Sequence, residues 1–236
     1  MSNLKSRIKE ILKELDFGKN LFADPTSPAI DDKGDYKKFI KGDQEAPNTE
    51  EEEEVLRDIH RFTVEQYDDI KALQKNAQKL LQLKSKFPEM LDPKQGKDVG
   101  EYIWRGATLP KEIVAKIAPK VDRGYADVNI NITPRSKRGI HSFSSNFYKA
   151  TQFMDMQWNS KHRNGRIPVA IGIKSDNPNF LLNPDFLENI TDYPNEREIF
   201  YVGDTFPVSK VYIEFSAPAS SRFREDEKFL KSLKKP

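Results

Sequence analysis

Three short groups of residues carry the most specific chemistry in this chain. They are Trp104-Arg105-Gly106, Ser142-Phe143-Ser144 and Glu196-Arg197-Glu198. An arginine on a strand offers a rigidly held, planar fork of donors that keeps its charge, which suits a pyrophosphate. Glu196 and Glu198 lie two residues apart, so on an extended segment both carboxylates face the same side and can serve one substrate complex. The same alternation places both serines on one face and Phe143 on the other.

Each group taken alone also has a simple structural explanation. Arginines are most often surface or ion-pair residues, serines occur at many strand edges, and paired glutamates often form a solvated strand face. The order of the three groups along the chain, each in a strand context, is more informative than any one of them. Together they favour a catalytic site over three unrelated surface features.

In this order and context, residues from about Val55 to Phe215 resemble the arginine-specific branch of the mono-ADP-ribosyltransferases. That family combines an aromatic-Arg-Gly strand, a Ser-x-Ser strand followed by a helix, and a Glu-x-Glu ahead of a third strand. Ala150 and Phe153 match its Ala-x-x-Phe helix, and residues 59–75 are similar to its first helix pair. Phe143 departs from the family pattern, which usually has Thr between the two serines.

The resemblance implies roles for the residues that would bind NAD. Arg105 would hold the dinucleotide, and the backbone of Gly106 would bond the nicotinamide amide, because a glycine permits close approach. Ser142 would hydrogen-bond Glu198 and the nicotinamide ribose, whereas Ser144 would be more structural. Phe153 matches the position that can stack on nicotinamide.

The resemblance also implies the catalytic roles. Glu198 would hold the ribose 2′-hydroxyl and stabilise the oxocarbenium-like transition state that forms as the nicotinamide bond breaks. Glu196 would orient an acceptor guanidinium and assist its deprotonation, since a Glu at this position accompanies arginine acceptors in the family. Tyr193, in the segment before the two glutamates, would contact the acceptor protein.

The predicted activity is therefore transfer of ADP-ribose from NAD, used as a substrate, to an arginine of a target protein, with release of nicotinamide. Three alternatives stay open. Water could replace the acceptor, which would make the protein an NAD glycohydrolase. The fold could serve as a non-catalytic binding module. Because phage-encoded relatives and bacterial toxins share this constellation, NAD-capped nucleic acid could also be joined to protein.

Composition narrows the kinds of partner and of chemistry that this protein can have. Lys and Arg (39) nearly balance Asp and Glu (37), which gives no indication of a nucleic-acid or membrane partner. The absence of cysteine removes disulfides, thiolate metal sites and cysteine nucleophiles, and the three histidines are too scattered to predict a metal. We find no signal peptide or membrane span and expect action in the cytoplasm of a bacterial host, or delivery as an effector.

These groups must be positioned by an α+β domain. We expect an N-terminal amphipathic helix and linker over residues 1–47, a catalytic domain over 48–216 and a surface tail over 217–236. Helical periodicity predicts two helices before residue 88. Beyond residue 98 the chain has β-rich segments at 101–106, 139–145, 166–173, 179–183, 197–202 and 210–215, interrupted by helices near 109–118 and 146–158. The resemblance implies two packed, mostly antiparallel sheets flanked by the N-terminal helices, with NAD in the cleft between the sheets.

Overall fold

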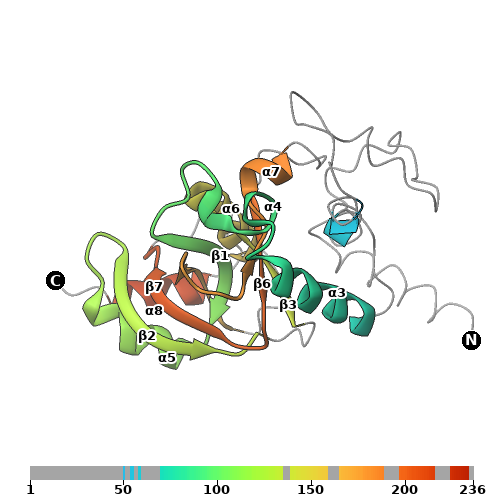
Figure 1. Cartoon of the computed structure of the whole chain (residues 1–236). Coiled ribbons are helices and arrows are strands. Elements are labelled where there is room, and N and C mark those ends of the chain that lie inside the picture. Colours follow the sequence, from blue (N-terminus) through green and yellow to red (C-terminus); the bar gives the residue numbers. More distant parts are fainter. Residues whose placement is uncertain are drawn as a thin grey trace, which may run out of the picture.

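The computed structural model describes residues 50, 54–55, 58–59, 70–134, 139–158, 165–188, 197–215 and 224–233. Within these ranges the chain is a mixture of helices and antiparallel strands, so the α+β class is confirmed (Figure 1). The predicted extension over residues 1–47 lies outside the described residues.

The helices and strands alternate along the chain as follows. The helices are α3 (Ile70–Leu83), α4 (Pro88–Leu91), α5 (Lys111–Ile117), α6 (Phe147–Trp158), α7 (Pro184–Glu188) and α8 (Arg224–Leu233), with 3-10 turns η2 (Pro93–Gln95) and η3 (Ala118–Lys120). The strands are β1 (Tyr102–Leu109), β2 (Tyr125–Ile132), β3 (Ile140–Ser144), β4 (Ile167–Lys174), β5 (Phe180–Leu181), β6 (Glu198–Val202) and β7 (Phe206–Tyr212).

The strands form one curled sheet of seven, in the order β2-β7-β4-β1-β3-β6-β5, and every recorded pairing is antiparallel. The expectation of two packed sheets is therefore wrong. The single sheet is continuous at its centre, where β1 and β3 are joined by one residue pair, Trp104 opposite Ser144. A junction this short allows the sheet to change direction without breaking its continuity.

We call β2, β7, β4 and β1 the four-strand half, and β3, β6 and β5 the three-strand half. In the four-strand half, β1 pairs with β4 over its whole length, from Tyr102 opposite Lys174 to Leu109 opposite Ile167. Strand β4 has seven consecutive buried residues, Ile167 to Ile173, because both of its faces are covered. This half is the regular frame of the molecule.

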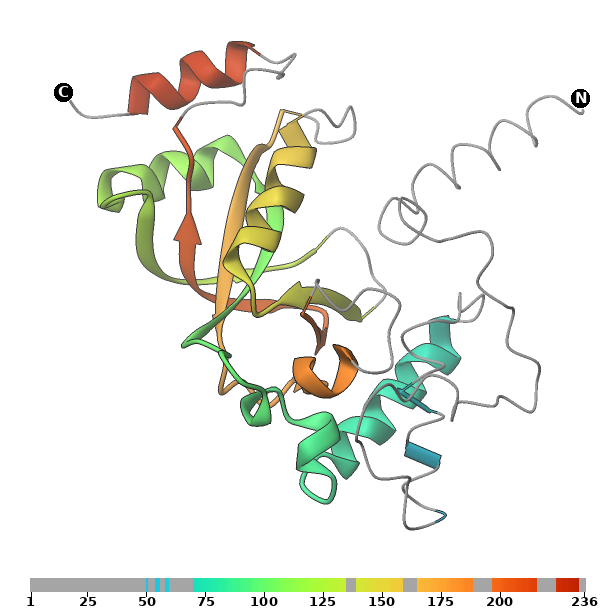
Figure 2. The same ribbon diagram turned by 90° about the horizontal axis from the view of Figure 1, so that it is seen from above.

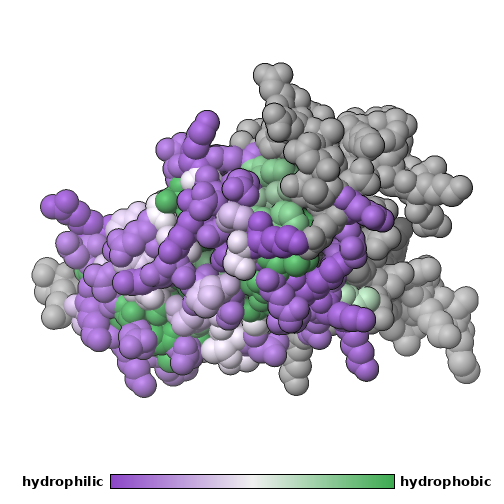
Figure 3. Space-filling model, viewed as in Figure 1, coloured by the Kyte–Doolittle hydropathy of each residue, from purple (hydrophilic) through white to green (hydrophobic). Residues whose placement is uncertain are grey.

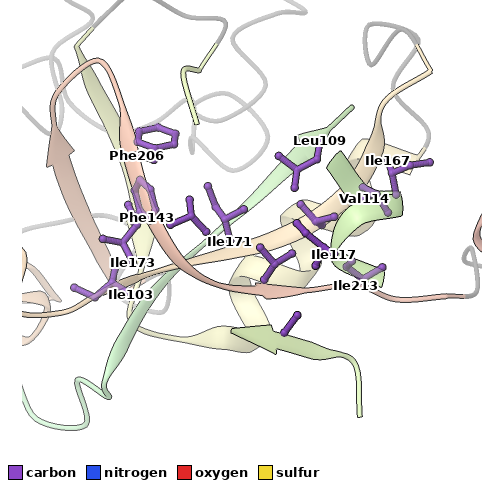
Figure 4. Packing of buried hydrophobic residues seen from close by; sticks show 14 of the residues in the cluster. Ile103, Leu109, Val114, Ile117, Phe143, Ile167, Ile171, Ile173, Phe206 and Ile213 are labelled. Atoms are coloured by element: carbon purple, nitrogen blue, oxygen red, sulfur yellow. The ribbon is translucent and has the colours of Figure 1, made fainter. Parts of the chain in front are cut away.

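The main core lies on one face of the sheet and extends into both halves. Figure 4 shows its aliphatic side chains and the rings of Phe143 and Phe206 lying against one another. Helices α5 and α8 cover the four-strand half (Figures 1 and 2). Leu230 of α8 is fully buried in this core, so part of the segment 217–236 that we expected as a surface tail contributes to packing.

Two smaller clusters complete the interior. On the other face of the four-strand half, α6 lies along β1 and β4, with Ala150 and Met154 against Trp104 and Ala170 (Figure 2). The three-strand half packs instead against α3 and α4, where Leu80 and Leu91 are fully buried. Charged and polar residues cover most of the face seen in Figure 3, in keeping with a chain that is 32% charged.

Candidate functional site

One row of residues crosses the junction between the two halves of the sheet. Trp104 of β1 lies opposite Ser144 of β3, and Ser144 lies opposite Glu198 of β6. Because residues directly opposite each other in an antiparallel sheet share a face, the three side chains leave the sheet on the same side. Each of the three predicted groups thus contributes one residue to the centre of the sheet, although the groups are far apart in sequence.

Arg105, the residue after Trp104, also lies at this junction, but alternation along β1 directs its side chain to the opposite face, where Phe143 lies. Its Nη1 donates to the backbone carbonyl of Ser142, and its Cζ lies 5.7 Å from the centre of the Phe143 ring. Continued pairing of β1 with β3 would place Gly106 opposite Ser142, but no such pair is recorded. The Arg105 side chain therefore satisfies a carbonyl of β3 that regular strand pairing would otherwise serve.

The charge of Arg105 is shaped by burial and by Glu198. Burial lowers the pKa of the Arg105 guanidinium from its ordinary value, and the negative charge of Glu198 acts against this by raising the pKa. An arginine keeps its proton under either influence. The predicted NAD-holding cation thus lies within reach of the charge of the predicted catalytic carboxylate.

The serine group has the alternation that its sequence predicts. Phe143 is buried in the main core among Phe180, Tyr201 and Phe206, with ring centroids 5.3 to 5.9 Å away. Ser142 and Ser144 leave β3 on the opposite face. Phe143 is thus a core residue, which gives a physical reason for an aromatic side chain at a position where the resembling family usually has Thr.

The two serines have different neighbours. Ser144 is 4% exposed, faces Glu198, and its Oγ accepts a 3.0 Å hydrogen bond from the backbone N–H of Asn146, just ahead of α6. Ser142 is half-buried and faces Phe200, one pair farther along. The serine directly opposite Glu198 is therefore Ser144. The predicted bond between Ser142 and Glu198 would run diagonally along the same face and stays a prediction.

Gly106 lies where helix α6 crosses β1 most closely. A Cβ at this position would lie 2.4 Å from the backbone nitrogen of Met154 and 2.7 Å from the carbonyl oxygen of Ala150. Both atoms belong to the helix backbone and cannot move aside as a flexible side chain could. The helix contact is thus sufficient to require glycine here, and the predicted bond from its backbone to nicotinamide stays a prediction.

Ala150 and Phe153, which match the Ala-x-x-Phe pattern, both lie on α6 above β1. Ala150 is 1% exposed and packs against Trp104, whereas Phe153 is half-buried and its backbone carbonyl carbon is close to Gly106. The small residue at 150 thus permits the close crossing of the helix. The stacking of Phe153 on nicotinamide is not tested by this geometry.

The Glu-x-Glu group differs from its prediction at its middle residue. Arg197 has φ 46°, which is left-handed backbone, and β6 begins only at Glu198. The segment is therefore not extended through Arg197, and alternation no longer places both carboxylates on the same side. Glu196 itself and Tyr193 lie outside the described residues.

Sequence reasoning missed the neighbours of Arg197. Asp185 of α7 forms an ion pair with Arg197, and Ser145, the residue after β3, accepts a hydrogen bond from its side chain. Nothing in the spacing of these residues indicates that they meet. The one available signal was Arg197 itself, a charged residue between the two glutamates.

A second group of carboxylates lies beside α6, on the four-strand half. Burial raises the pKa of Asp155, and burial together with the charge of Asp155 raises the pKa of Glu214. Oδ1 of Asp155 is buried and has no hydrogen-bond partner among the described residues. The rings of Tyr125 and Tyr212 lie next to each other here, 5.1 Å between centroids. This group is separate from the Ser144–Glu198 row.

Searches for other kinds of site gave no candidate in the described ranges. They contain no cluster of three or more His, Asp or Glu residues that could hold a metal ion, and no helix long and apolar enough to cross a membrane. Comparisons with protein families, with curated proteins and with solved structures found no match. The functional argument therefore depends on the geometry at the β1–β3–β6 junction.

Proposed function

We propose that this protein is an NAD-dependent mono-ADP-ribosyltransferase that modifies an arginine of a target protein. One observation carries the proposal: Arg105, the two serines and Glu198 come from three separate strands and lie at one junction of the sheet. The serines and Glu198 are on one face and Arg105 is on the face of Phe143, and the charge of Glu198 acts on Arg105. Chance placement of surface residues would not bring these particular groups together. The resemblance in sequence supplies the reaction.

The first chemical step assigned to this site is loss of nicotinamide. The bond from ribose C1′ to the nicotinamide nitrogen breaks, and its electron pair leaves with nicotinamide. The carboxylate of Glu198 holds the ribose 2′-hydroxyl and stabilises the positive charge that develops on the ribose. Its place at the start of a strand paired to β3 holds this carboxylate on a rigid element.

The second step is capture of the ribose cation. A guanidinium nitrogen of the acceptor forms a bond to C1′, and the proton that this nitrogen loses passes to Glu196. The products are ADP-ribosylated arginine, free nicotinamide and one proton. No metal takes part in this scheme, because the carboxylate supplies the electrostatic stabilisation.

Arg105 must exchange partners when NAD binds. Its Nη1 now donates to the carbonyl of Ser142, which is a neutral acceptor. A pyrophosphate oxygen is a charged acceptor and forms a stronger, bidentate contact with the same fork of donors. The Ser142 carbonyl thus holds the guanidinium at the junction until the dinucleotide arrives.

A second candidate function is NAD glycohydrolysis, in which water captures the ribose cation. The left-handed backbone at Arg197 favours this alternative, because alternation does not place Glu196 beside Glu198, where it would prepare an arginine acceptor. Arg105, the serines and Glu198 would act unchanged in this reaction. The two enzymes differ only in the species that attacks C1′.

The test is a time course of nicotinamide release from NAD labelled in the adenylate, with and without a mixed protein extract. We compare the wild type with Glu198→Gln, which keeps the shape of the side chain and removes its charge. A matched control is Glu112→Gln, an exposed glutamate on α5, which is not one of the strands that form the junction. We expect Glu198→Gln to lose about 100- to 1000-fold in rate while its urea unfolding stays unchanged.

Each outcome assigns the protein to one class. Label that enters proteins, at arginines identified by peptide mass, supports the transferase. Nicotinamide release without label transfer supports the glycohydrolase. No turnover by the wild type in either condition overturns both enzymes and leaves a non-catalytic module.

A further inference from the structure

Backbone strain gathers at the base of the three-strand half. Four non-glycine residues in the described ranges have positive φ: Asp98 (58°), Arg123 (48°), Leu182 (76°) and Arg197 (46°). Three of them, all except Arg123, border the start of β6. Non-glycine residues rarely adopt this conformation, and they keep it only where surrounding contacts hold them. Such contacts are present around Arg197.

Arg197 is held through both its side chain and its backbone. Its Nε donates to Ser145 Oγ at 3.0 Å, and its Nη2 donates to the carbonyl of Lys97. Nη2 also lies 2.9 Å from Oδ1 of Asp185. In the opposite direction, the carbonyl of Arg197 accepts a 3.2 Å bond from the N–H of Ser145. A lysine could not copy this set, because one ammonium group cannot present a planar fork to three acceptors.

The backbone N–H and carbonyl of Lys97 bond to the side chains of Asp185 and Arg197. The N–H of Lys97 donates to Oδ2 of Asp185, while its carbonyl accepts from Arg197. The side chains of Arg197 and Asp185 are only 19% and 28% exposed, so solvent screens this pair less than an ordinary surface pair. The three groups form a closed ring of contacts just ahead of Glu198.

The ring is anchored to the helices below the sheet. The backbone N–H of Asp185 donates to Oδ1 of Asn183 at 3.0 Å, and Nδ2 of Asn183 donates to the carbonyl of Glu89 at 2.7 Å. Asn183 is 7% exposed, and its own N–H bonds the carbonyl of Met90. Arg197 is thus connected through α7 to α4, part of the packed interior of the three-strand half.

We propose that Arg197 and Asp185, with the Lys97 peptide and Ser145, form a clamp that positions the carboxylate of Glu198 for catalysis. The inference rests on the proposed function, because it assigns Glu198 the catalytic role. Glu198 is the first residue of β6, and the ends of paired strands are where pairing frays. The clamp extends the β3–β6 pairing by one step, from Ser144–Glu198 to Ser145–Arg197, and closes it with side chains.

The clamp acts on Glu198 and has no recorded contact with Arg105, the residue that would hold the dinucleotide. Arg105 lies on β1 and is held by Ser142 and Phe143, none of which touches Arg197 in the recorded contacts. Loss of the clamp should therefore displace the catalytic carboxylate and leave NAD binding intact. Arg197 and Asp185 are positioning residues in this scheme, because they act through Glu198.

The experiment separates the side chain of Arg197 from its backbone conformation. Arg197→Gly removes the side chain at a residue type that accepts positive φ without strain, and Arg197→Ala removes the same side chain but keeps the strain. Asp185→Asn removes the charge of the ion pair and leaves one oxygen that can accept from the N–H of Lys97. A matched control is Lys111→Met, which breaks an ion pair of 2.7 Å with Asp226 between α5 and α8, on the four-strand half. We measure kcat and KM for nicotinamide release in each.

We expect kcat to fall about 10- to 100-fold in both Arg197→Gly and Arg197→Ala, with the KM for NAD unchanged, because a carboxylate misplaced by about 1 Å costs this much. Asp185→Asn should lose less, since Arg197 keeps its bonds to Ser145 and Lys97. Lys111→Met should keep both kinetic parameters. If Arg197→Gly retains full kcat, if kcat and KM change together, or if the control loses as much, the positioning role is overturned.

A measurement without NAD separates failure of the clamp from failure of the proposed function. Hydrogen exchange at the N–H of Ser145 should accelerate at least tenfold in Arg197→Gly and stay unchanged in Lys111→Met, because that N–H bonds the Arg197 carbonyl. Unchanged exchange in Arg197→Gly overturns the clamp itself. Accelerated exchange with a wild type that releases no nicotinamide shows that the clamp exists and that the catalytic assignment, and its positioning role with it, is wrong.

Discussion

The two halves of the sheet are held together by different interactions. In the four-strand half, β1 and β4 pair over eight residues, and apolar side chains cover both faces of β4. In the three-strand half, the strands have five, five and two residues, and polar contacts secure their ends. The difference separates a half stabilised by long strand pairings from a half whose short strands carry the serines and the glutamate of the candidate site. The candidate site lies where the two halves join.

The halves also differ in where they store strain. Among the described non-glycine residues, the strands of the four-strand half are bordered by positive φ in the turn at Arg123, while Leu182 and Arg197 border strands of the other half. Strained residues persist where neighbours over-determine them, and such places often serve a function. Four predictions test whether stability and site geometry really separate in this way.

The largest expected effect on stability comes from the interior of the four-strand half. Ile171 is fully buried in β4, so Ile171→Ala should lower the free energy of unfolding by about 2–5 kcal/mol. In the three-strand half, Asp185→Asn should cost about 1 kcal/mol or less. Urea unfolding of both variants measures the contrast. Equal losses would break the division between the halves.

Gly106 tests the close crossing of α6 over β1. A methyl group at 106 would meet the helix backbone, so Gly106→Ala should cost about 1–3 kcal/mol. Gly100→Ala is the matched control, because a Cβ there meets nothing within 4 Å and its backbone does not require positive φ. Thermal unfolding of the pair checks the expectation. A tolerated alanine at 106 would show that the helix can move away from the strand.

Substitution of Arg105 tests whether β1 supplies a residue that binds NAD. Arg105→Lys keeps the positive charge but loses the planar fork, so the KM for NAD should rise about tenfold with a smaller change in kcat. This is the reverse of the pattern expected for Arg197. Initial rates of nicotinamide release over a range of NAD concentrations provide the comparison. A fall in kcat alone would mean that Arg105 serves catalysis and not binding.

The smallest effect concerns the carboxylates beside α6. The folded protein raises the pKa of Asp155 above its ordinary value of 3.8, so the folded state holds this proton more tightly than the unfolded state. That contribution is present below about pH 4 and is lost as the pH rises through the raised pKa. At pH 7, Asp155→Asn should therefore gain up to about 1 kcal/mol relative to the wild type.

The control for that prediction is Asp176→Asn, at an exposed position in the turn after β4. As a substitution at an exposed position, it should leave the free energy of unfolding at pH 7 close to that of the wild type. If Asp155→Asn also follows the wild type between pH 4 and 7, the carboxyl group of Asp155 is better solvated than its buried oxygen implies.

Sequence alone predicts most of the four-strand half, because that half follows local rules. The apolar run in residues 166–173 became β4, and the helices near 109–118 and 146–158 became α5 and α6. Strand β2 was not predicted, although its alternating residues from Ala126 to Ile132 carry the period of two. Asn and Asp at the other positions of β2 are poor strand formers, and they weaken the signal.

The candidate site was only partly predictable, for a different reason. Each of the three motifs is a short stretch of sequence, and their order along the chain led to the prediction of Arg105, the serines and Glu198. The bend at the junction depends on a single residue pair between β1 and β3, which no local pattern encodes. The left-handed Arg197 also depends on distant partners, Lys97, Ser145 and Asp185, since its residue type alone favours ordinary backbone.

The strand order also determines when each strand can pair while the protein is being synthesised. β7 lies between β2 and β4, and β6 lies between β3 and β5, so the last two strands to be made are the ones that fill the gaps in each half. Of the seven strands, only β1 has both of its neighbours in place before residue 198 leaves the ribosome. The nascent chain therefore holds unpaired strand edges until late in translation, when shielding by chaperones matters most.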